Sequence, residues 1–475
     1  MAVWSTTSLA KILGCDRIDG EYFLPIYLEN DRKLDSIKTF SLPEKFFVSD
    51  GNHMTVSHWF SDSGDVPYYR GQDVNDFFLE NATPVKIPHS IYDSNLMKRS
   101  HFREGDVLLS IVGTIGSLSV VPHGIGDATG SCKIAILRKK SPYSPFALAA
   151  FLATKFGQLQ IKRNTRGAVQ MGLILRDLSK IRIPDLSDKV LQKVDILIQE
   201  AIKKNHEARI SYSSAEELLS SALKEGDLKL SHPLSYTAKF SDIMRERRTD
   251  AEYYQPKYDE YFAKIKKYPG GISKVSNHFK QNKDTIKFTL PEYNYIEIGD
   301  INVGNGEATF NLLPTEDLPA NAKHLVKRGD ILISKVRPYR GAVSVIDFEP
   351  ENLIASGAFT ILRETGDVKK EVLVILLRTP IYRDWLLKWN VGSSYPVIKD
   401  EDVLNLTIPI IRRDIQEQIA AKVQESFALR KESKHLLDLA KHAVEIAIEQ
   451  GEDAAQKILD SAFARKQAIL DKYLQ

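Results

Sequence analysis

The sequence predicts an α+β fold that is internally duplicated, with two globular α/β modules separated by a long antiparallel two-helix coiled coil. Three observations predict this. The same motifs occur twice in the same order, about 225 residues apart, as with Ile183 and Ile408. Each copy contains short strand-like runs broken by turn residues, and each is followed by a long apolar stripe of helical period. Since the repeat spans a whole domain, it indicates duplication of that domain and not a short solenoid repeat.

The repeated motifs mark the beginning, the middle and the end of each copy. The pairs are Arg17-Ile-Asp19-Gly-Glu21-Tyr22 with Arg248-Thr-Asp250-Ala-Glu252-Tyr253, Gly105-Asp106-Val-Leu-Leu-Ser110 with Gly329-Asp330-Ile-Leu-Ile-Ser334, and Ile183-Pro184 with Ile408-Pro409. The acidic residues of the opening motif recur together with a tyrosine. This recurrence favours a structural or docking role for them over a catalytic one.

Between the middle and closing motifs, each copy has the same order of predicted elements. Strand-like runs come first, then a helical stretch at 145–159 or 370–388, then a glycine loop at 166–168 or 391–393. The predicted strands lie at 107–112, 119–121 and 134–137 in the first copy, and at 331–334, 342–346 and 359–362 in the second. A small α+β module is the expected result.

After each closing Ile-Pro the sequence predicts a long helix. Apolar residues then recur at steps of three and four, which describe one stripe on a helix. A 37-residue helix from Asp188 to Lys224 is roughly 55 Å long at about 1.5 Å per residue, and its single stripe needs a partner. The stripes are Val190, Val194, Leu197, Ala201, Ala208, Tyr212, Ala215, Leu219 and Ala222, and Ile415, Ile419, Val423, Phe427, Leu437, Ala440, Val444 and Ala447. We expect the two helices to pack on one another as an antiparallel coiled coil.

Composition and length place the chain among ordinary globular proteins. It has 475 residues, of which 43% are hydrophobic and 27% charged, and its longest apolar runs are too short to span a bilayer. The two cysteines, Cys15 and Cys132, have no motif spacing and favour a reducing compartment. We therefore expect a cytoplasmic protein that does not interact with a membrane.

Charge is concentrated in one stretch of each copy, although the net charge is only +3. Six basic residues stand against one acid in 161–182, and six against one in 323–340, a net of +5 in each stretch. A basic patch is the electrostatic feature by which proteins bind nucleic acid. A solvated charged surface is the alternative interpretation of either stretch taken alone.

Taken together, the motifs resemble those of the specificity (S) subunit of type I restriction-modification systems. The resemblance rests on two modules each followed by a long helix, the Gly-Asp-Val/Ile-Leu motifs and the Ile-Pro exits. Tyr68-Tyr69-Arg70-Gly71-Gln72-Asp73-Val74-Asn75 is also similar to that family, with Tyr295-Ile-Glu-Ile-Gly-Asp300-Ile-Asn302 as its counterpart. The similarity runs from about Arg17 to about Gln450.

The resemblance implies a fold and a function. Residues 1–186 would be the first target-recognition domain, 187–230 the first spacer helix and turn, 231–411 a linker and the second target-recognition domain, and 412–475 the second spacer helix and a helical tail. Each domain would read one half of a bipartite double-stranded DNA sequence. The helices would set the spacing and dock DNA adenine methyltransferase subunits, and the complex would recruit a restriction and translocase subunit. The chain itself would be non-catalytic and carry no cofactor, with S-adenosylmethionine and ATP on the partner subunits.

Candidate DNA-binding residues follow from local chemistry and not from the resemblance. Arg, Lys, Asn and Gln are the usual choices for base edges and phosphates. The candidates are Tyr69, Arg70, Lys162, Arg163, Asn164, Arg166 and Gln170 in the first copy, and Lys283, Lys287, Lys335, Arg337, Tyr339, Arg340, Ser393, Ser394 and Tyr395 in the second.

Other signals are weaker. His53 and His58 have no metal-ligand spacing, so a loop is the better interpretation. Gly113-Thr-Ile-Gly116 is not followed by the Lys-Ser/Thr pair of a phosphate-binding loop, which favours a hairpin turn. No catalytic set recurs in both copies, which makes an unrecognised nuclease or methyltransferase the least favoured function. A duplicated protein-scaffolding adaptor without DNA specificity remains the alternative to DNA recognition.

Overall fold

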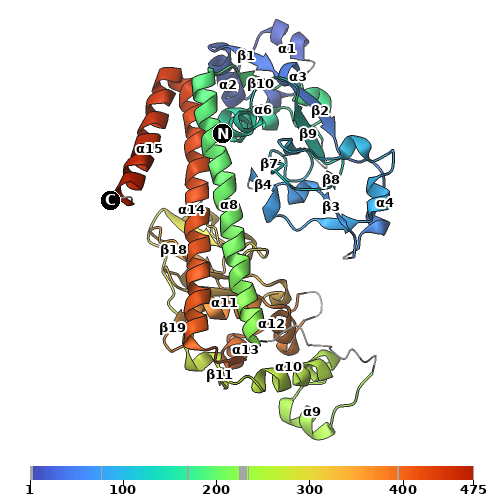
Figure 1. Cartoon of the computed structure of the whole chain (residues 1–475), viewed down its shortest axis with the longest axis vertical. Coiled ribbons are helices and arrows are strands. Elements are labelled where there is room, and N and C mark those ends of the chain that lie inside the picture. Colours follow the sequence, from blue (N-terminus) through green and yellow to red (C-terminus); the bar gives the residue numbers. More distant parts are fainter. Residues whose placement is uncertain are drawn as a thin grey trace. The chain divides into compact units, whose positions relative to one another are not determined.

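The computed structural model describes residues 4–15, 17–61, 63–75, 77–167, 171–223, 233, 235–392 and 395–473 (Figure 1). The chain forms two units, one of residues 1–206 with 429–475 and one of residues 207–428. Both boundaries fall within long helices, α8 (Asp188–Leu223) and α14 (Arg413–Gln450). Each long helix therefore contributes one half to each unit. The predicted turn up to residue 230 and the predicted linker start at 231 lie outside the described residues.

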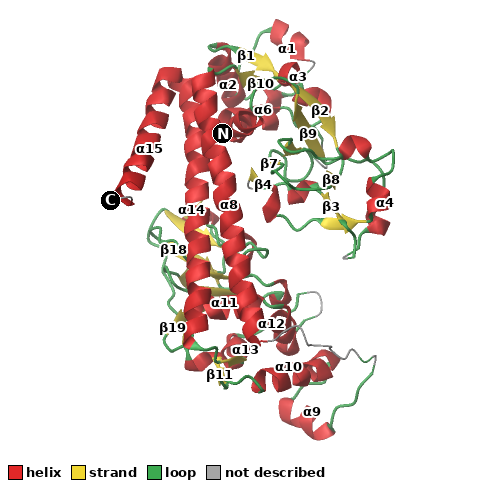
Figure 2. Ribbon diagram, in the orientation of Figure 1, coloured by secondary structure: helices red, strands yellow, loops and turns green. Residues whose placement is uncertain are grey.

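The sheets of the first unit have the strand orders β2-β9-β6-β7-β4, β5-β3-β8 and β1-β10 (Figure 2). Most neighbours are antiparallel, but β3 runs parallel to β8 and β4 runs parallel to β7. The strands are β1 Thr39–Ser41, β2 Phe46–Asp50, β3 Val66–Tyr69, β4 Phe77–Phe78, β5 Val85–Ile87, β6 Val107–Ser110, β7 Leu118–Val120, β8 Thr129–Gly130, β9 Ile134–Lys139 and β10 Arg182–Pro184. The helices before α8 are α1 Leu9–Cys15, α2 Pro25–Asp35, α3 Leu42–Lys45, α4 His89–Tyr92, α5 Pro145–Ala153, α6 Lys155–Arg163 and α7 Leu175–Leu178.

The sheets of the second unit have the orders β12-β19-β16-β17, β14-β13-β18-β15 and β11-β20. The strands are β11 Ile272–Lys274, β12 Phe279–Gln281, β13 Glu292–Ile296, β14 Asn311–Pro314, β15 Ala322–Leu325, β16 Ile331–Ser334, β17 Val343–Val345, β18 Leu353–Ser356, β19 Phe359–Glu364 and β20 Thr407–Pro409. The helices are α9 Phe240–Glu246, α10 Pro256–Lys266, α11 Lys370–Arg378, α12 Pro380–Trp385 and α13 Asp400–Asn405.

The two units share one topology, which confirms the predicted duplication of an α+β fold. The order β2-β9-β6-β7 corresponds to β12-β19-β16-β17, and the parallel pair β3 and β8 corresponds to β13 and β18. The closing Ile-Pro motifs are the strands β10 and β20. Ile183 pairs antiparallel with Phe40, and Ile408 pairs antiparallel with Ser273.

Each predicted helical stretch before the glycine loop is interrupted at a threonine. The hydroxyl of Thr154 accepts a hydrogen bond from the Gly157 N–H and so caps α6, which follows α5 directly. Thr379, 225 residues later, caps α12 through the Tyr382 N–H in the same way. A threonine side chain can satisfy the free N–H groups at the start of a helix, so the chain changes direction there. Each predicted helical stretch therefore consists of two successive helices, α5 with α6 and α11 with α12.

The long helices pack against one another along their predicted stripes. In the first unit Val194 and Ala201 of α8 share a hydrophobic core with Ala440 and Val444 of α14. In the second unit Tyr212 and Ala215 of α8 belong to one core with Ile419 and Val423 of α14. The helices run antiparallel, because the earlier half of α8 meets the later half of α14 in the first unit and the reverse holds in the second. This arrangement confirms the predicted coiled coil.

Small side chains and hydroxyl groups line the seam between the two helices. The Ser433 hydroxyl donates to the Ala201 carbonyl at 2.6 Å in the first unit, and the Ser426 hydroxyl donates to the Ala208 carbonyl at 2.7 Å in the second. Asn205 of α8, which interrupts the apolar stripe between Ala201 and Ala208, is buried, and its amide donates to Asn81 at 3.1 Å. Each of these buried polar groups therefore has a hydrogen-bond partner, as most buried polar groups in stable proteins do.

The tail folds back on the first unit as helix α15 (Glu452–Tyr473). Ala455 and Leu459 are buried in the same core as the start of α8. The Ser187 N–H donates to Glu452 at 3.0 Å, and Lys193 forms an ion pair with Asp460. The apolar stripe of the tail thus covers the beginning of the first long helix.

Candidate nucleic-acid interface

In the first unit, the repeated opening motif ties the start of the module to the end of α6. The Arg17 guanidinium pairs with Asp19 at 2.6 Å, lies 4.9 Å from the Tyr22 ring centroid and donates to the Thr165 carbonyl. Arg163 lies on the same ring at 4.1 Å. The hydrogen bond with Asp19 raises the pKa of Arg17, so this cation is stabilised in place.

The second unit repeats this arrangement. Arg248 pairs with Asp250 at 2.7 Å, lies 4.7 Å from the Tyr253 ring centroid and donates to the carbonyls of Trp389 and Asn390. The motif therefore holds the segment that leads into the glycine loop in both modules. This contact accounts for the recurrence of the acidic residues without any catalytic role.

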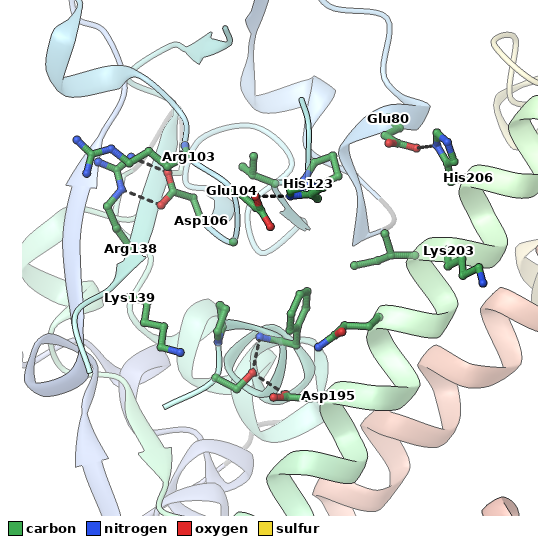
Figure 3. A pocket seen from close by; sticks show the side chains of 18 of the residues that line it. Glu80, Arg103, Glu104, Asp106, His123, Arg138, Lys139, Asp195, Lys203 and His206 are labelled. Atoms are coloured by element: carbon green, nitrogen blue, oxygen red, sulfur yellow. Dashed lines mark hydrogen bonds and ion pairs between the residues drawn. The ribbon is translucent and has the colours of Figure 1, made fainter. Parts of the chain in front are cut away.

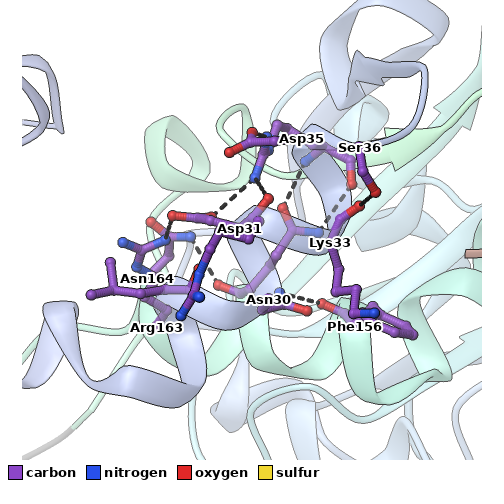
Figure 4. A network of polar contacts seen from close by, with 12 residues as sticks. Asn30, Asp31, Lys33, Asp35, Ser36, Phe156, Arg163 and Asn164 are labelled. Carbon is purple, nitrogen blue, oxygen red and sulfur yellow. Dashed lines mark hydrogen bonds and ion pairs between the residues drawn. The ribbon is translucent and has the colours of Figure 1, made fainter. Parts of the chain in front are cut away.

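The basic stretch of the first module is largely engaged in internal ion pairs (Figure 4). Arg163 pairs with Asp31 at 2.6 Å, and Arg182 contacts the same carboxylate at 3.0 Å. Arg166 pairs with Asp177 at 2.6 Å. Arg163 and Arg182 hold α2, α6 and the closing strand together, and Arg166 holds the segment after α6 to α7. The charge of all three is balanced within the fold.

Asp177 is fully buried and is the centre of one of these pairs. Burial of its carboxyl raises the pKa, but hydrogen bonds from Arg166 and Lys180 outweigh burial and leave the pKa below its ordinary value. Removal of a single partner from such a buried pair is costly, because a charge is then left without compensation.

The other first-module candidates differ in exposure, and some are buried while others lie at the surface. Asn164 is buried and donates to the Gln160 carbonyl at 2.8 Å, and Tyr69 is buried against Phe102. Arg70 pairs with Asp73 at 3.1 Å in the turn after β3. Lys162 is exposed on α6. Gln170 lies outside the described residues.

The second-module candidates gather around the turn between β16 and β17. Lys335, just after β16, pairs with Asp400 at 3.2 Å. Arg337, Tyr339 and Arg340 form the turn itself, and Arg340 is exposed. Tyr395 is 65% exposed, and the Arg337 guanidinium lies 4.5 Å from its ring centroid. The structure thus brings together two stretches that are separated by more than fifty residues in the sequence.

The remaining second-module candidates lie away from this turn or outside the described residues. Lys283 and Lys287 are exposed in the loop between β12 and β13. Ser393 and Ser394 lie outside the described residues. Val391 and Val397 exchange two backbone hydrogen bonds of 2.9 and 3.0 Å.

Two further arginines converge on the turn between β16 and β17, and sequence reasoning missed both. Arg383 Nε donates to the Tyr339 carbonyl at 2.8 Å, and Arg378 donates to the Gly341 carbonyl at 3.0 Å. Burial lowers the pKa of Arg383, and the charge of Arg378 lowers it further. Aligning the repeats would have given a signal, because position 383 corresponds to Gln158 and position 378 to Ala153, 225 residues earlier.

A cavity of about 980 Å³ lies in the first unit between the strand layer and the start of α8 (Figure 3). Its charges are of both signs. Asp195 accepts a hydrogen bond from Ser144 at 2.5 Å, and burial raises the pKa of its carboxyl. His206 contacts Glu80 at 3.1 Å, and Glu104 also lines the cavity. Four carboxylates and four lysines or arginines line the cavity, so its charge gives no specific attraction for DNA phosphates.

The described residues contain neither a cluster of metal ligands nor a helix that could span a membrane. No group of three or more His, Cys, Asp or Glu side chains there is arranged to hold a metal ion. His53 instead contacts Asp50 at 2.6 Å. None of the helices in the described part of the chain has the length and apolar character needed to cross a membrane.

Comparison with known proteins bears on the resemblance drawn from the motifs. No protein-family model matches the sequence. A stretch of 155 residues is 29% identical to the type I restriction enzyme HindI specificity subunit of Haemophilus influenzae. The aligned stretch covers 32% of this chain and 32% of that protein. The chain thus matches about a third of the length of that curated relative. This match confirms the predicted resemblance to the specificity subunits of type I restriction-modification systems.

Two solved structures align with most of this chain at low TM-scores. The S subunit of a type I restriction-modification system from M. genitalium aligns over 89% of this chain and 95% of its own, with 10% identity and a TM-score of 0.40. The HsdS subunit from Thermoanaerobacter tengcongensis aligns over 87% of this chain and 97% of its own, with 15% identity and a TM-score of 0.28.

Proposed function

We propose that the chain is the DNA-recognition subunit of a type I restriction-modification complex, in which each module reads one half of a bipartite duplex sequence. The observation that supports this most strongly is the common topology of two modules, each followed by one of two long helices that pack antiparallel. A reader that consists of two similar parts suits a target that consists of two parts, and the connection between the readers sets the half-site spacing. The sequence relationship to a HindI specificity subunit points the same way.

In this proposal the two kinds of DNA contact come from different residues. Exposed lysines and arginines neutralise phosphates and provide the salt-dependent part of the affinity. Lys162, Lys283, Lys287 and Arg340 are exposed and suit that role. Base reading requires side chains that can enter the major groove, and the turn between β16 and β17 with Tyr395 is our candidate in the second module.

The partner subunits would use the outer faces of the long helices. Ile196 and Ile210 of α8 are 50% and 56% exposed although they lie on a helix whose other face is buried. Singly exposed apolar side chains are common on protein surfaces, so the assignment of these faces to a partner protein rests on the family resemblance. We assign this contact to adenine methyltransferase subunits, with a restriction and translocase subunit joining the complex.

The division of labour follows from these assignments. S-adenosylmethionine and ATP would bind to the partner subunits, while this chain would select the sequence without catalysing a reaction, in the cytoplasm. The target-recognition domains would comprise residues 1–186 and 231–411. The spacer segments would comprise 187–230 and 412–475.

The proposal is tested by sequencing methylated adenines in the genome of the host with and without the gene. Deletion should abolish methylation at one split motif, and the intact gene on a plasmid should restore it. If no split motif disappears, the proposal fails. A chain that then still binds other proteins but not duplex DNA would be the scaffolding adaptor.

A further inference from the structure

The turn after β16 contains an arginine in a backbone conformation that favours glycine. Arg337 has φ of 50° and ψ of 53°, in the left-handed region. Side chains other than glycine, asparagine and aspartate rarely adopt this region, because the Cβ atom approaches the backbone. In the first module the corresponding position after β6 is Gly113, with φ of 86°.

Equivalent hydrogen bonds establish that these two positions correspond. The Ser110 hydroxyl donates to the Val112 carbonyl at 3.3 Å, and the Ser334 hydroxyl donates to the Val336 carbonyl at 2.8 Å. The residue after each of these valines is the left-handed one. The same backbone geometry is therefore occupied by glycine in one copy and by arginine in the other.

The second module holds the strained arginine from several sides. The Arg337 N–H donates to the Pro396 carbonyl at 2.8 Å, and its carbonyl accepts from the Arg340 N–H at 3.0 Å. Arg378 and Arg383 support the carbonyls on the far side of the turn. A strained residue persists only where its surroundings enforce it, and such residues cluster at functional sites. Since glycine would fit this position without strain, the fold gives no reason for a side chain here.

The side chain of Arg337 is arranged for recognition. Its guanidinium lies 4.5 Å from the ring centroid of Tyr395, which is 65% exposed at the adjacent hairpin. Stacking on an aromatic ring orders the planar group and limits its rotation. An ordered guanidinium presents two parallel N–H donors, and the O6 and N7 atoms of guanine accept such a pair in the major groove. Arg378 and Arg383 add positive charge behind the turn, which favours approach to DNA.

We propose that Arg337 reads a guanine in the half-site of the second module, with Tyr395 as the residue that positions its guanidinium. This inference rests on the proposed function, because it requires that the second module contacts DNA. Lysine carries the same charge but lacks the fork of two donors, so it cannot replace arginine in this contact.

The test uses the full-length chain in its host, with adenine methylation mapped across the genome for the Arg337→Lys and Arg337→Gly variants. Both should relax the requirement for one guanine in one half of the split motif by about tenfold or more, and leave the other half unchanged. The matched control is Arg247→Gly. Arg247 is likewise left-handed, with φ of 52°, and is exposed, but it lies at the end of α9. This control should leave the motif unaltered.

The alternatives give distinct results. If Arg337→Lys keeps full specificity while Arg337→Gly weakens methylation equally at all sequences, the residue contacts phosphate and the inference is overturned. An unchanged motif in both variants, or a motif without a required guanine in either half, overturns it as well. If the wild-type chain directs no split motif at all, the proposed function itself has failed.

Discussion

The corresponding turn is uncharged in the first module and positively charged in the second. After β6 the chain runs through Gly113 to Gly116, and Gln158 on α6 donates to the Gly116 carbonyl at 2.9 Å. After β16 it runs through Arg337 to Gly341, and the corresponding support comes from Arg383. Both turns have a left-handed residue at the corresponding position, glycine in the first module and arginine in the second, so the two turns differ in charge. The two modules therefore share a topology but differ in the chemistry of the surface that could contact DNA.

The basic stretches of the two modules also differ in how their arginines are used. In the first module Arg163, Arg166 and Arg182 pair with aspartates inside the fold. In the second module the stretch includes the turn at Arg337 and the exposed Arg340. Equal net charge in the sequence therefore corresponds to structural ion pairs in one copy and to a surface in the other.

The largest expected effect concerns the buried ion pair that is present in only one module. Asp177→Ala leaves Arg166 and Lys180 without their carboxylate and should lower the free energy of unfolding by about 3 kcal/mol. The corresponding Asp402 accepts a hydrogen bond from the Lys399 N–H at the start of α13. Asp402→Ala should therefore cost about 1 kcal/mol, as for other lost helix caps.

Urea denaturation of both variants measures this difference. Asp177→Asn, which retains the shape of the side chain, is the control and should lie between Asp177→Ala and the wild type. Equal losses for the two alanine variants would show that the first basic stretch is not held internally in the way that we describe.

A second expected effect comes from exchanging charge between the two turns. Arg383→Gln should weaken DNA binding several-fold and reduce the salt slope of log K by about 1, because one cation near the phosphates is lost. Gln158→Arg should increase the slope by a similar amount. Fluorescence anisotropy with the target duplex at several salt concentrations, on the chain assembled with its partner subunits, measures both slopes.

Arg383→Lys is the control for the charge exchange and should keep the slope of the wild type. A slope that does not change in either exchange variant would mean that neither turn lies near the DNA backbone. The support of the turn would then be the whole role of Arg383.

The smallest expected effect is a pH dependence confined to the first module. Burial raises the pKa of Asp195, and the corresponding residue 225 positions later is Ala420. When the pKa of a carboxyl is higher in the folded state than in the unfolded state, the folded protein loses stability as pH rises from the unfolded pKa of about 3.9 to the folded pKa. Asp195→Asn should therefore be more stable than the wild type at neutral pH, by less than about 1 kcal/mol.

Thermal unfolding between pH 3 and pH 8 would measure this difference. The two curves should converge below pH of about 3.9, where the wild-type carboxyl is protonated in both states. A constant difference across the whole range would show that the substitution acts through packing, such as an altered contact with Ser144, and not through ionisation.

Much of the architecture could be predicted from the sequence because it depends on local periodicity. The stripes on α8 and α14 identify the buried face of each helix, and the residues of both stripes are buried or partly buried. The strands at Val107–Ser110 and Ile331–Ser334 follow from short apolar runs between turn residues. The duplication was visible because corresponding motifs keep nearly the same interval through both copies.

Only the tertiary structure decided which charges meet. Arg163 finds Asp31 across 132 positions, and Arg378 and Arg383 reach the turn at Arg337 from other elements. The breaks at Thr154 and Thr379 likewise depend on side-chain caps that compete with a continuous helix. Periodicity records which face of an element is buried, because that depends on neighbours one turn away. It does not indicate which distant side chain a residue contacts. The ion pairs of the arginines and the left-handed conformation of Arg337 are therefore seen only in the folded chain.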